Sequence, residues 1–217
     1  MTAPDVPQLC LVIDSGPTAR ERLLAALAAA PIASVVLRGA AGAPLDARAA
    51  KPLVELLQAK GVAALIEADA RLARTLRADG VHLTWSRASH AAYDEAREIL
   101  GARAIVGVDA GASRHDAMEL AEAGADYIAF GIPDDAEDRS AALNARGGMV
   151  AWWSEIFEIP CVALDVDDVA EACALYSIAP DFMAITIAAG LSAAEVGNLV
   201  RAIAVTATSA AALGGTT

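Results

Sequence analysis

Two hydrophobic periodicities alternate along this chain of 217 residues, and a short segment marks where one gives way to the other. The segment places a small residue and an Asp after a predicted helix and then begins a short apolar run. It occurs at 78–83, at 124–131 and, in a weaker form, at 179–185. The recurrence predicts a repeated helix–strand unit, which is typical of α/β proteins with a parallel sheet.

Eight such units can be traced from end to end. The expected strands are 9–13, 33–37, 62–66, 80–83, 104–108, 126–130, 160–164 and 181–185. The expected helices are 18–30, 46–60, 69–77, 89–101, 113–124, 149–157, 167–177 and 192–204, with Pro52 allowing the second to begin nearer Lys51. Residues 132–148 are expected to form a long polar loop.

The short apolar strands, rich in Val, Ile and Ala, suit parallel strands covered on both faces. Eight regular units favour a single-domain (β/α)8 TIM barrel over 9–205, with an N-terminal extension over 1–8 and a flexible tail over 206–217. An open doubly wound sheet is the alternative, but no G-x-G-x-x-G turn follows Asp14 to support it.

Composition excludes several function classes. The chain is 56% hydrophobic and 20% charged, so it can bury a large core. Its formal net charge of −12, without a basic stripe, argues against nucleic-acid binding. No apolar run predicts a membrane span or a signal peptide, so we expect a cytoplasmic protein. Three widely spaced cysteines, Cys10, Cys161 and Cys173, are expected to be reduced thiols.

The strand segments carry a family resemblance over residues 9–203. The residues are Leu11-Val12-Ile13-Asp14, Val36-Leu37-Arg38, Ala78-Asp79-Gly80-Val81-His82-Leu83, Ile105-Val106-Gly107-Val108 and Gly124-Ala125-Asp126-Tyr127-Ile128-Ala129-Phe130-Gly131. By these the chain resembles the thiamine phosphate synthase and thiazole tautomerase family. The resemblance implies a single barrel that joins an aminopyrimidine pyrophosphate to a thiazole phosphate with Mg²⁺, releasing pyrophosphate.

The same comparison shows replacements at the positions where the family binds metal and phosphate. Glu67-Ala68 stands where the family has Asn-Asp, Thr84-Trp85-Ser86-Arg87 where it has Gly-Gln and a second metal-binding Asp, and Asp165-Val166 where paired Gly residues hold a phosphate. Gly39-Ala40 lacks the family's Lys, the Thr-x-Thr-Lys element is absent from 132–146, and the last phosphate-binding Ser falls at about Ile187. We therefore expect Mg²⁺ ligands not to be retained and synthase activity to be absent or very low.

Candidate site residues follow from this placement. Arg38, His82, Trp85, Asp109 and Asp165 are expected to contact a small-molecule ligand, Asp69 is a candidate metal ligand by a one-residue shift, and no catalytic residue is assigned. Acids at strand ends would make an acidic mouth that takes a cation or amine. They could equally be helix caps, which is plausible for Asp14 and Asp69.

Three functions remain open at this point. The chain is a divergent synthase-like protein that handles a phosphorylated or heterocyclic small molecule, a non-catalytic barrel that binds a metabolite or protein, or a metal-dependent enzyme of other chemistry. Trp152 and Trp153 share a helix with Phe157, and one of the two could mark a homodimer interface.

Overall fold

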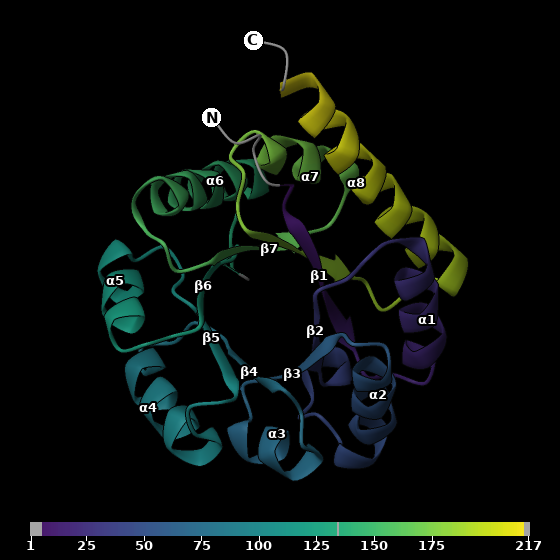
Figure 1. Cartoon of the computed structure of the whole chain (residues 1–217), viewed down its shortest axis with the longest axis vertical. Coiled ribbons are helices and arrows are strands. Elements are labelled where there is room, and N and C mark those ends of the chain that lie inside the picture. Colours follow the sequence, from purple (N-terminus) through teal and green to yellow (C-terminus); the bar gives the residue numbers. More distant parts are fainter. Residues whose placement is uncertain (1–5, 134, 215–217) are drawn as a thin grey trace.

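Eight parallel strands close into a barrel in the order of the sequence, and α-helices surround it (Figure 1). The computed structural model describes residues 6–133 and 135–214. The strands are β1 (Gln8–Asp14), β2 (Ser34–Arg38), β3 (Ala63–Glu67), β4 (Gly80–Leu83), β5 (Ile105–Asp109), β6 (Tyr127–Phe130), β7 (Cys161–Val166) and β8 (Phe182–Ile187). β8 pairs with β1 and closes the ring. The single-domain TIM barrel is confirmed.

The helices alternate with the strands and cover the barrel. They are α1 (Ala19–Ala29), α2 (Ala47–Ala59), α3 (Ala70–Leu76), α4 (Ser89–Leu100), α5 (Arg114–Glu122), α6 (Arg139–Ile156), α7 (Val169–Tyr176) and α8 (Ala193–Gly214), with a short 3₁₀ turn η1 (Ala40–Gly42) after β2. α8 packs against both α7 and α1, which joins the last unit to the first (Figure 1).

Alternation along the strands separates two apolar layers. Outward-facing residues such as Leu11 and Ile13 pack against the helices in the main core. Inward-facing residues form a smaller cluster inside the barrel, made of Cys10, Val12, Val36, Leu65, Ala129, Val162, Leu164 and Ala184. In TIM barrels such inward side chains pack the interior, and the active site lies at the carboxyl end of the strands.

Side-chain caps start several helices where the sequence predicts them. Asp69 Oδ1 accepts a hydrogen bond from the Leu72 amide at 2.8 Å, and Ser113 Oγ accepts from the Asp116 amide at 3.1 Å. Thr18, the first residue of the expected helix over 18–30, occupies the N-cap position of α1, but its hydroxyl makes no cap hydrogen bond.

The start of α2 agrees with the expected helix over 46–60 and not with the alternative start nearer Lys51, whereas the start of α6 differs from the prediction. α2 begins at Ala47, because Asp46 Oδ1 accepts from both Arg48 N and Ala49 N at 2.9 Å, and exposed Pro52 lies inside the helix. α6 begins at Arg139, ten residues before the expected start at 149, because Asp138 caps it. Much of the predicted loop over 132–148 is therefore helix.

The ends of the chain also differ. β1 begins at Gln8, and residues 1–5 of the expected extension lie outside the described residues. α8 continues to Gly214, beyond the expected end at 204, so most of the segment expected to be a flexible tail is helical. Residues 215–217 lie outside the described range.

Two other sequence-based expectations concern single residues. Cys10 and Cys161 are buried free thiols, and Cys173 is an exposed one. Trp153 is buried in the core, whereas Trp152 is half-buried beneath the Arg114 guanidinium, 4.6 Å from its ring centroid. The homodimer stays a prediction.

In the part of the chain that the structure describes, no helix combines the length and apolarity needed to cross a bilayer.

Candidate functional site

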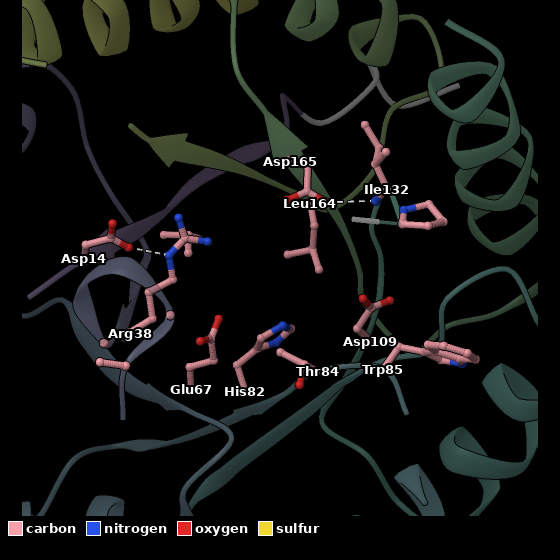
Figure 2. Close-up of a pocket in the computed structure, with 15 residues that line it drawn as sticks. Asp14, Arg38, Glu67, His82, Thr84, Trp85, Asp109, Ile132, Leu164 and Asp165 are labelled. Atoms are coloured by element: carbon pink, nitrogen blue, oxygen red, sulfur yellow. Dashed lines mark hydrogen bonds and ion pairs between the residues drawn. The ribbon is translucent and has the colours of Figure 1, made fainter. Parts of the chain in front are cut away.

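A cavity of about 550 Å³ opens where the strands end at their carboxyl termini (Figure 2). We call it the mouth. Its lining residues are Val12, Asp14, Arg38, Gly39, Gly42, Ala43, Glu67, His82, Thr84, Trp85, Asp109, Ile132, Pro133, Leu164 and Asp165. The volume suits a small organic molecule. All five residues expected to contact a ligand line it, although no bound ligand tests that role.

Asp14 and Arg38 form the central ion pair of the mouth. They end β1 and β2 directly opposite one another in register, and Arg38 Nε donates to Asp14 Oδ1 at 2.5 Å. Burial opposes the charge of Arg38, but this hydrogen bond and the attraction of Asp14, Glu67 and Asp165 raise its pKa above the ordinary value. Asp14 therefore binds Arg38 and does not cap α1, which was one of the roles the sequence allowed.

Asp109 and Asp165 converge on the opposite wall, over Gly131. A Cβ placed on Gly131 would lie 3.0 Å from Asp165 Oδ2 and 3.1 Å from Asp109 Oδ2, so a larger residue would push the carboxylates away by a few tenths of an ångström. Asp109 Oδ1 accepts from Gly111 N, and Asp165 Oδ2 accepts from Ile132 N, each at 2.8 Å.

The environment of Asp109 favours its protonated form. Burial raises its pKa to about 6, and the negative charge of Asp165 adds to the shift, while backbone hydrogen bonds from Gly111 and Gly131 oppose it. A carboxyl group with this pKa exchanges protons near neutral pH, which is a property that general acids and bases share.

A bulge in β7 turns Asp165 into the mouth. The register with β8 slips by one residue between Ala163 and Val166, and Asp165 has the left-handed backbone angle φ of +57°. Consecutive residues of a regular strand point to opposite faces, yet Leu164 and Asp165 both line the cavity.

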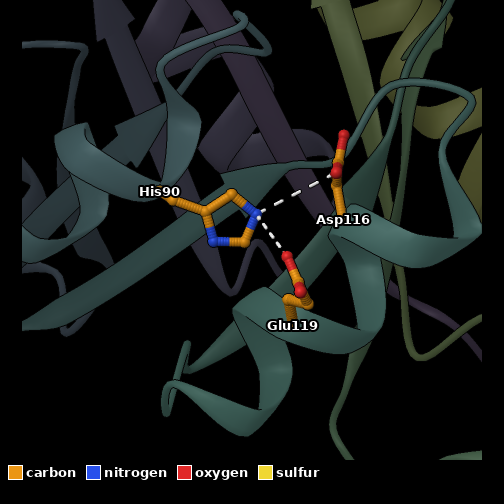
Figure 3. Close-up of side chains that lie close together, drawn as sticks. All are labelled: His90, Asp116 and Glu119. Carbon is orange, nitrogen blue, oxygen red and sulfur yellow. Dashed lines mark ion pairs between the residues drawn. The ribbon is translucent and has the colours of Figure 1, made fainter.

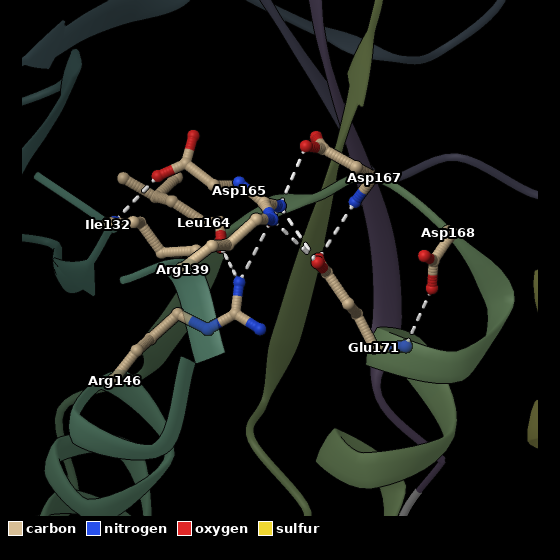
Figure 4. Close-up of polar contacts among 8 residues, drawn as sticks. All are labelled: Ile132, Arg139, Arg146, Leu164, Asp165, Asp167, Asp168 and Glu171. Carbon is tan, nitrogen blue, oxygen red and sulfur yellow. Dashed lines mark hydrogen bonds and ion pairs between the residues drawn. The ribbon is translucent and has the colours of Figure 1, made fainter. Parts of the chain in front are cut away.

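Two arginines of α6 bind the bulge at the end of β7 and the start of α7 that follows it (Figure 4). Buried Arg146 donates from Nη1 to the carbonyl oxygens of Leu164 and Asp165, the latter at 3.0 Å. Arg139 binds Glu171 Oε1 at 2.8 Å and Asp167 Oδ2 at 2.7 Å. Both guanidinium groups are thus bound to acceptors of the protein itself. Sequence reasoning missed Arg146 because it placed this part of α6 in a loop.

Carboxylates of the chain also occupy the helix N-termini that follow β7 and β8. Asp168 Oδ1 accepts from Glu171 N at 2.9 Å at the start of α7. At the start of α8, Glu195 Oε2 accepts from Ser192 N at 2.8 Å and from Ser192 Oγ at 2.6 Å. In many barrels this region binds phosphate through free backbone amides. In this chain it presents negative charge instead.

His82 forms the floor of the mouth and is neutral. Burial lowers its pKa to about 4. Its Nδ1 lies 2.9 Å from the Tyr127 hydroxyl, and the two rings are parallel with centroids 5.9 Å apart. Beneath it lies an apolar cavity of about 230 Å³ inside the barrel, which Tyr127 and Cys10 also line. Tyr127 was not recognised from the sequence as part of this arrangement.

Trp85 forms a wall of the mouth. Its indole ring covers Gly111 of the β5–α5 loop, where an added Cβ would lie 2.7 Å from the ring. Trp85 is nevertheless 51% exposed, so part of its surface is open to a ligand.

The magnesium site implied by the resemblance does not fit these residues. Asp69 is exposed, caps α3 and does not line the mouth. Among the described residues, no three carboxylate, imidazole or thiolate ligand atoms of the mouth lie within 4.8 Å of one another. That Asp69 binds a metal stays a prediction. Its capping hydrogen bond to the Leu72 amide would compete with a metal for the same carboxylate.

One group of potential ligands does meet that distance, away from the mouth (Figure 3). His90 Nε2 of α4 lies 3.4 Å from Glu119 Oε2 and 4.0 Å from Asp116 Oδ1 of α5. His115 Nε2 contacts the other oxygen of Glu119 at 3.2 Å. These side chains are partly or largely exposed, and their contacts are those of surface ion pairs between neighbouring helices.

Comparisons with known proteins agree on one family. A family model described as "Thiamine monophosphate synthase" matches residues 9–174. A thiamine-phosphate synthase of Erythrobacter litoralis is 42% identical over 64% of this chain and 65% of its own length. One of Rhodospirillum centenum is 39% identical over 75% of this chain and 78% of its own.

A solved structure agrees in fold. The thiamine phosphate pyrophosphorylase of Pyrococcus furiosus superposes with a TM-score of 0.70 at 18% identity, covering 97% of this chain and 99% of its own. At that identity the likeness concerns the fold only.

Proposed function

The chain belongs to the thiamine monophosphate synthase family, and from this premise we propose that it keeps the family's small-molecule mouth but has little or no synthase activity. The relatives carry the name of the synthase, so retained activity is the direct alternative.

One observation carries the proposal. The helix N-termini after β7 and β8 are occupied by Asp168 and Glu195, at the end of the barrel where a phosphate would be held. A phosphate placed there would meet carboxylates, whose repulsion opposes the attraction of the remaining backbone amides. The match to the family model, which ends at residue 174, does not include β8 or α8.

The cations of the region do not compensate. Arg38 is paired with Asp14, and Arg139 and Arg146 are bound to acceptors around the β7–α7 loop. Displacing pyrophosphate requires cations and donors that take up the charge developing on the leaving group. Arg38 in the mouth and the two arginines beside it already have partners, so they supply little of this stabilisation.

The test is a coupling assay with aminopyrimidine pyrophosphate, thiazole phosphate and Mg²⁺, beside the synthase of Erythrobacter litoralis as a positive control. We expect product at or near the level without enzyme, and titration calorimetry with pyrophosphate should give no heat of binding. Coupling at a rate within tenfold of the control would overturn the proposal.

A second candidate is acid–base chemistry at the mouth, which the pKa of about 6 at Asp109 favours. If that chemistry used a divalent metal, the metal would bind the native state and raise the melting temperature. A thermal-shift series with Mg²⁺, Mn²⁺ and Zn²⁺ at pH 7.5 distinguishes a metal-dependent reaction from a metal-free one.

We also propose a cytoplasmic location, supported by the free thiols of Cys10, Cys161 and Cys173.

A further inference from the structure

We propose that the mouth selects a flat, positively charged ligand that carries no phosphate, stacked on Trp85 and paired with the carboxylates of Asp109 and Asp165. The inference rests on the proposed function in one respect, since both require the mouth to be a small-molecule site. It adds the chemical class of the ligand.

The charge of the mouth is the first argument. The described residues that line it include four with carboxylates, Asp14, Glu67, Asp109 and Asp165, and one with a Lys or Arg side chain, Arg38. Arg38 is bound to Asp14, and His82 is neutral at pH 7. A ligand that enters this cavity meets an excess of negative charge in a partly desolvated space, where attraction of a cation is stronger than in water.

The pair of carboxylates over Gly131 is the second argument. Among the described residues, no Lys, Arg or His side chain lies within 4.0 Å of the carboxylate of Asp109 or Asp165. Asp165 accepts a hydrogen bond from the Ile132 amide, and Asp109 accepts from the amides of Gly111 and Gly131, so each carboxylate keeps further acceptor sites. A ligand with several N–H donors and a positive charge would bridge them and relieve their repulsion.

Trp85 is the third argument, and it defines the shape of the ligand. Gly111 supports one side of the indole, because a Cβ at that residue would collide with the ring at 2.7 Å. The ring is thereby held beside the cavity with much of its surface open. Indole faces attract both flat rings and cations, so a flat cation is the kind of ligand that both the Trp85 indole and the two carboxylates would attract.

The sharpest test uses three probes of nearly equal shape and different charge: benzamidine, benzamide and benzoate. Calorimetric titrations at pH 8 should show binding of benzamidine, at least tenfold weaker binding of neutral benzamide, and no binding of benzoate. Equal affinity for benzamidine and benzoate would overturn the proposal, and so would the absence of benzamidine binding at millimolar concentration.

Variants locate the site. Asp165→Asn should weaken benzamidine binding about tenfold, and Trp85→Ala about fivefold, whereas Trp85→Tyr should retain most of the affinity because a ring remains. The control is Glu98→Gln, which makes the same charge change on an exposed face of α4 and should leave binding unaltered. Melting temperatures show whether each variant is folded. If Trp85→Ala does not fold, Trp85→Tyr against Trp85→Leu gives the same comparison. Unchanged affinity in Asp165→Asn would refute the assignment.

The two proposals fail in different ways. Binding of pyrophosphate together with coupling activity refutes the proposed function whatever benzamidine does. Absence of both, with no preference among the three probes, leaves the proposed function standing and refutes the cationic ligand.

Discussion

Arg38 donates a hydrogen bond from Nε to Oδ1 of Asp14 at 2.5 Å, across two strands on which the residues stand in direct register. Among the described residues, Arg38 is the only Lys or Arg side chain that lines the mouth, and its neighbour on β1 neutralises it. The carboxylates of Asp109 and Asp165 on the other wall therefore give the mouth its negative character.

Removing the charge of Asp14 should make the mouth more receptive to anions. Asp14→Asn keeps an oxygen that can accept from Arg38 but leaves the guanidinium charge uncompensated. We expect a heat of pyrophosphate binding, which the wild-type protein should not give, to become measurable by calorimetry at low salt. Glu98→Gln serves as the matched control and should give no such heat. Equal heats in both variants would mean that only overall charge matters and that the ion pair of Asp14 and Arg38 does not control anion binding.

The pKa of Asp109 predicts a pH-dependent gain in stability on neutralising it. The folded-state pKa, about 6, exceeds the ordinary value of 3.8. The carboxyl therefore stabilises the fold fully only below pH 3.8, and this contribution is lost as the pH rises through 6. Asp109→Asn should raise the free energy of unfolding at pH 8, because it removes the cost of a buried negative charge. We expect a gain of about 1–2 kcal/mol, less than the full pKa shift implies, because the side chain retains some exposure to solvent.

The gain from Asp109→Asn should disappear near pH 4, where the wild-type carboxyl is protonated. Both proteins contain His82, whose lowered pKa destabilises the fold as the pH falls from 6.5 toward 4, so their difference isolates Asp109. Urea denaturation at pH 4, 6 and 8 measures it. A constant difference across that range would contradict the raised pKa.

The left-handed conformation of Asp165 predicts an unusual ranking of two variants. Both Asp165→Gly and Asp165→Ala remove the hydrogen bond from Ile132 N, but glycine adopts a φ of +57° without steric cost. The glycine variant should be more stable than the alanine variant by about 1 kcal/mol. Thermal denaturation checks the order, and alanine equal to glycine would show that the bulge relaxes when Asp165 is lost.

Gly107 provides the space in which Tyr127 reaches His82. A Cβ at Gly107 would lie 1.9 Å from the Tyr127 ring, so Gly107→Ala must displace the ring and break its contact with His82. We expect a loss of about 3 kcal/mol in the free energy of unfolding. Gly148→Ala is the control, since nothing lies within 4 Å of its added Cβ on α6, and it should be neutral or slightly stabilising. Equal effects of the two substitutions would contradict this packing.

The barrel and the position of its mouth follow from the sequence, because they depend on short-range patterns. Apolar runs of strand length, Asp residues such as Asp46 and Asp69 before helices, and acids at strand ends act over a few residues. The same patterns placed Arg38, His82, Trp85, Asp109 and Asp165 at one end of the fold, where the structure brings them together.

Only the tertiary structure decided which partner each of these groups has. Asp14 lies 24 residues from Arg38, and Asp165 lies 33 residues from Ile132, so neither contact leaves a local signal in the chain. The bulge that turns Asp165 inward and the buried Arg146 that holds its carbonyl depend on how α6 packs beside β7. Periodicity specifies which elements form, but the pairing of charges is determined by the register of strands and helices that are distant in sequence.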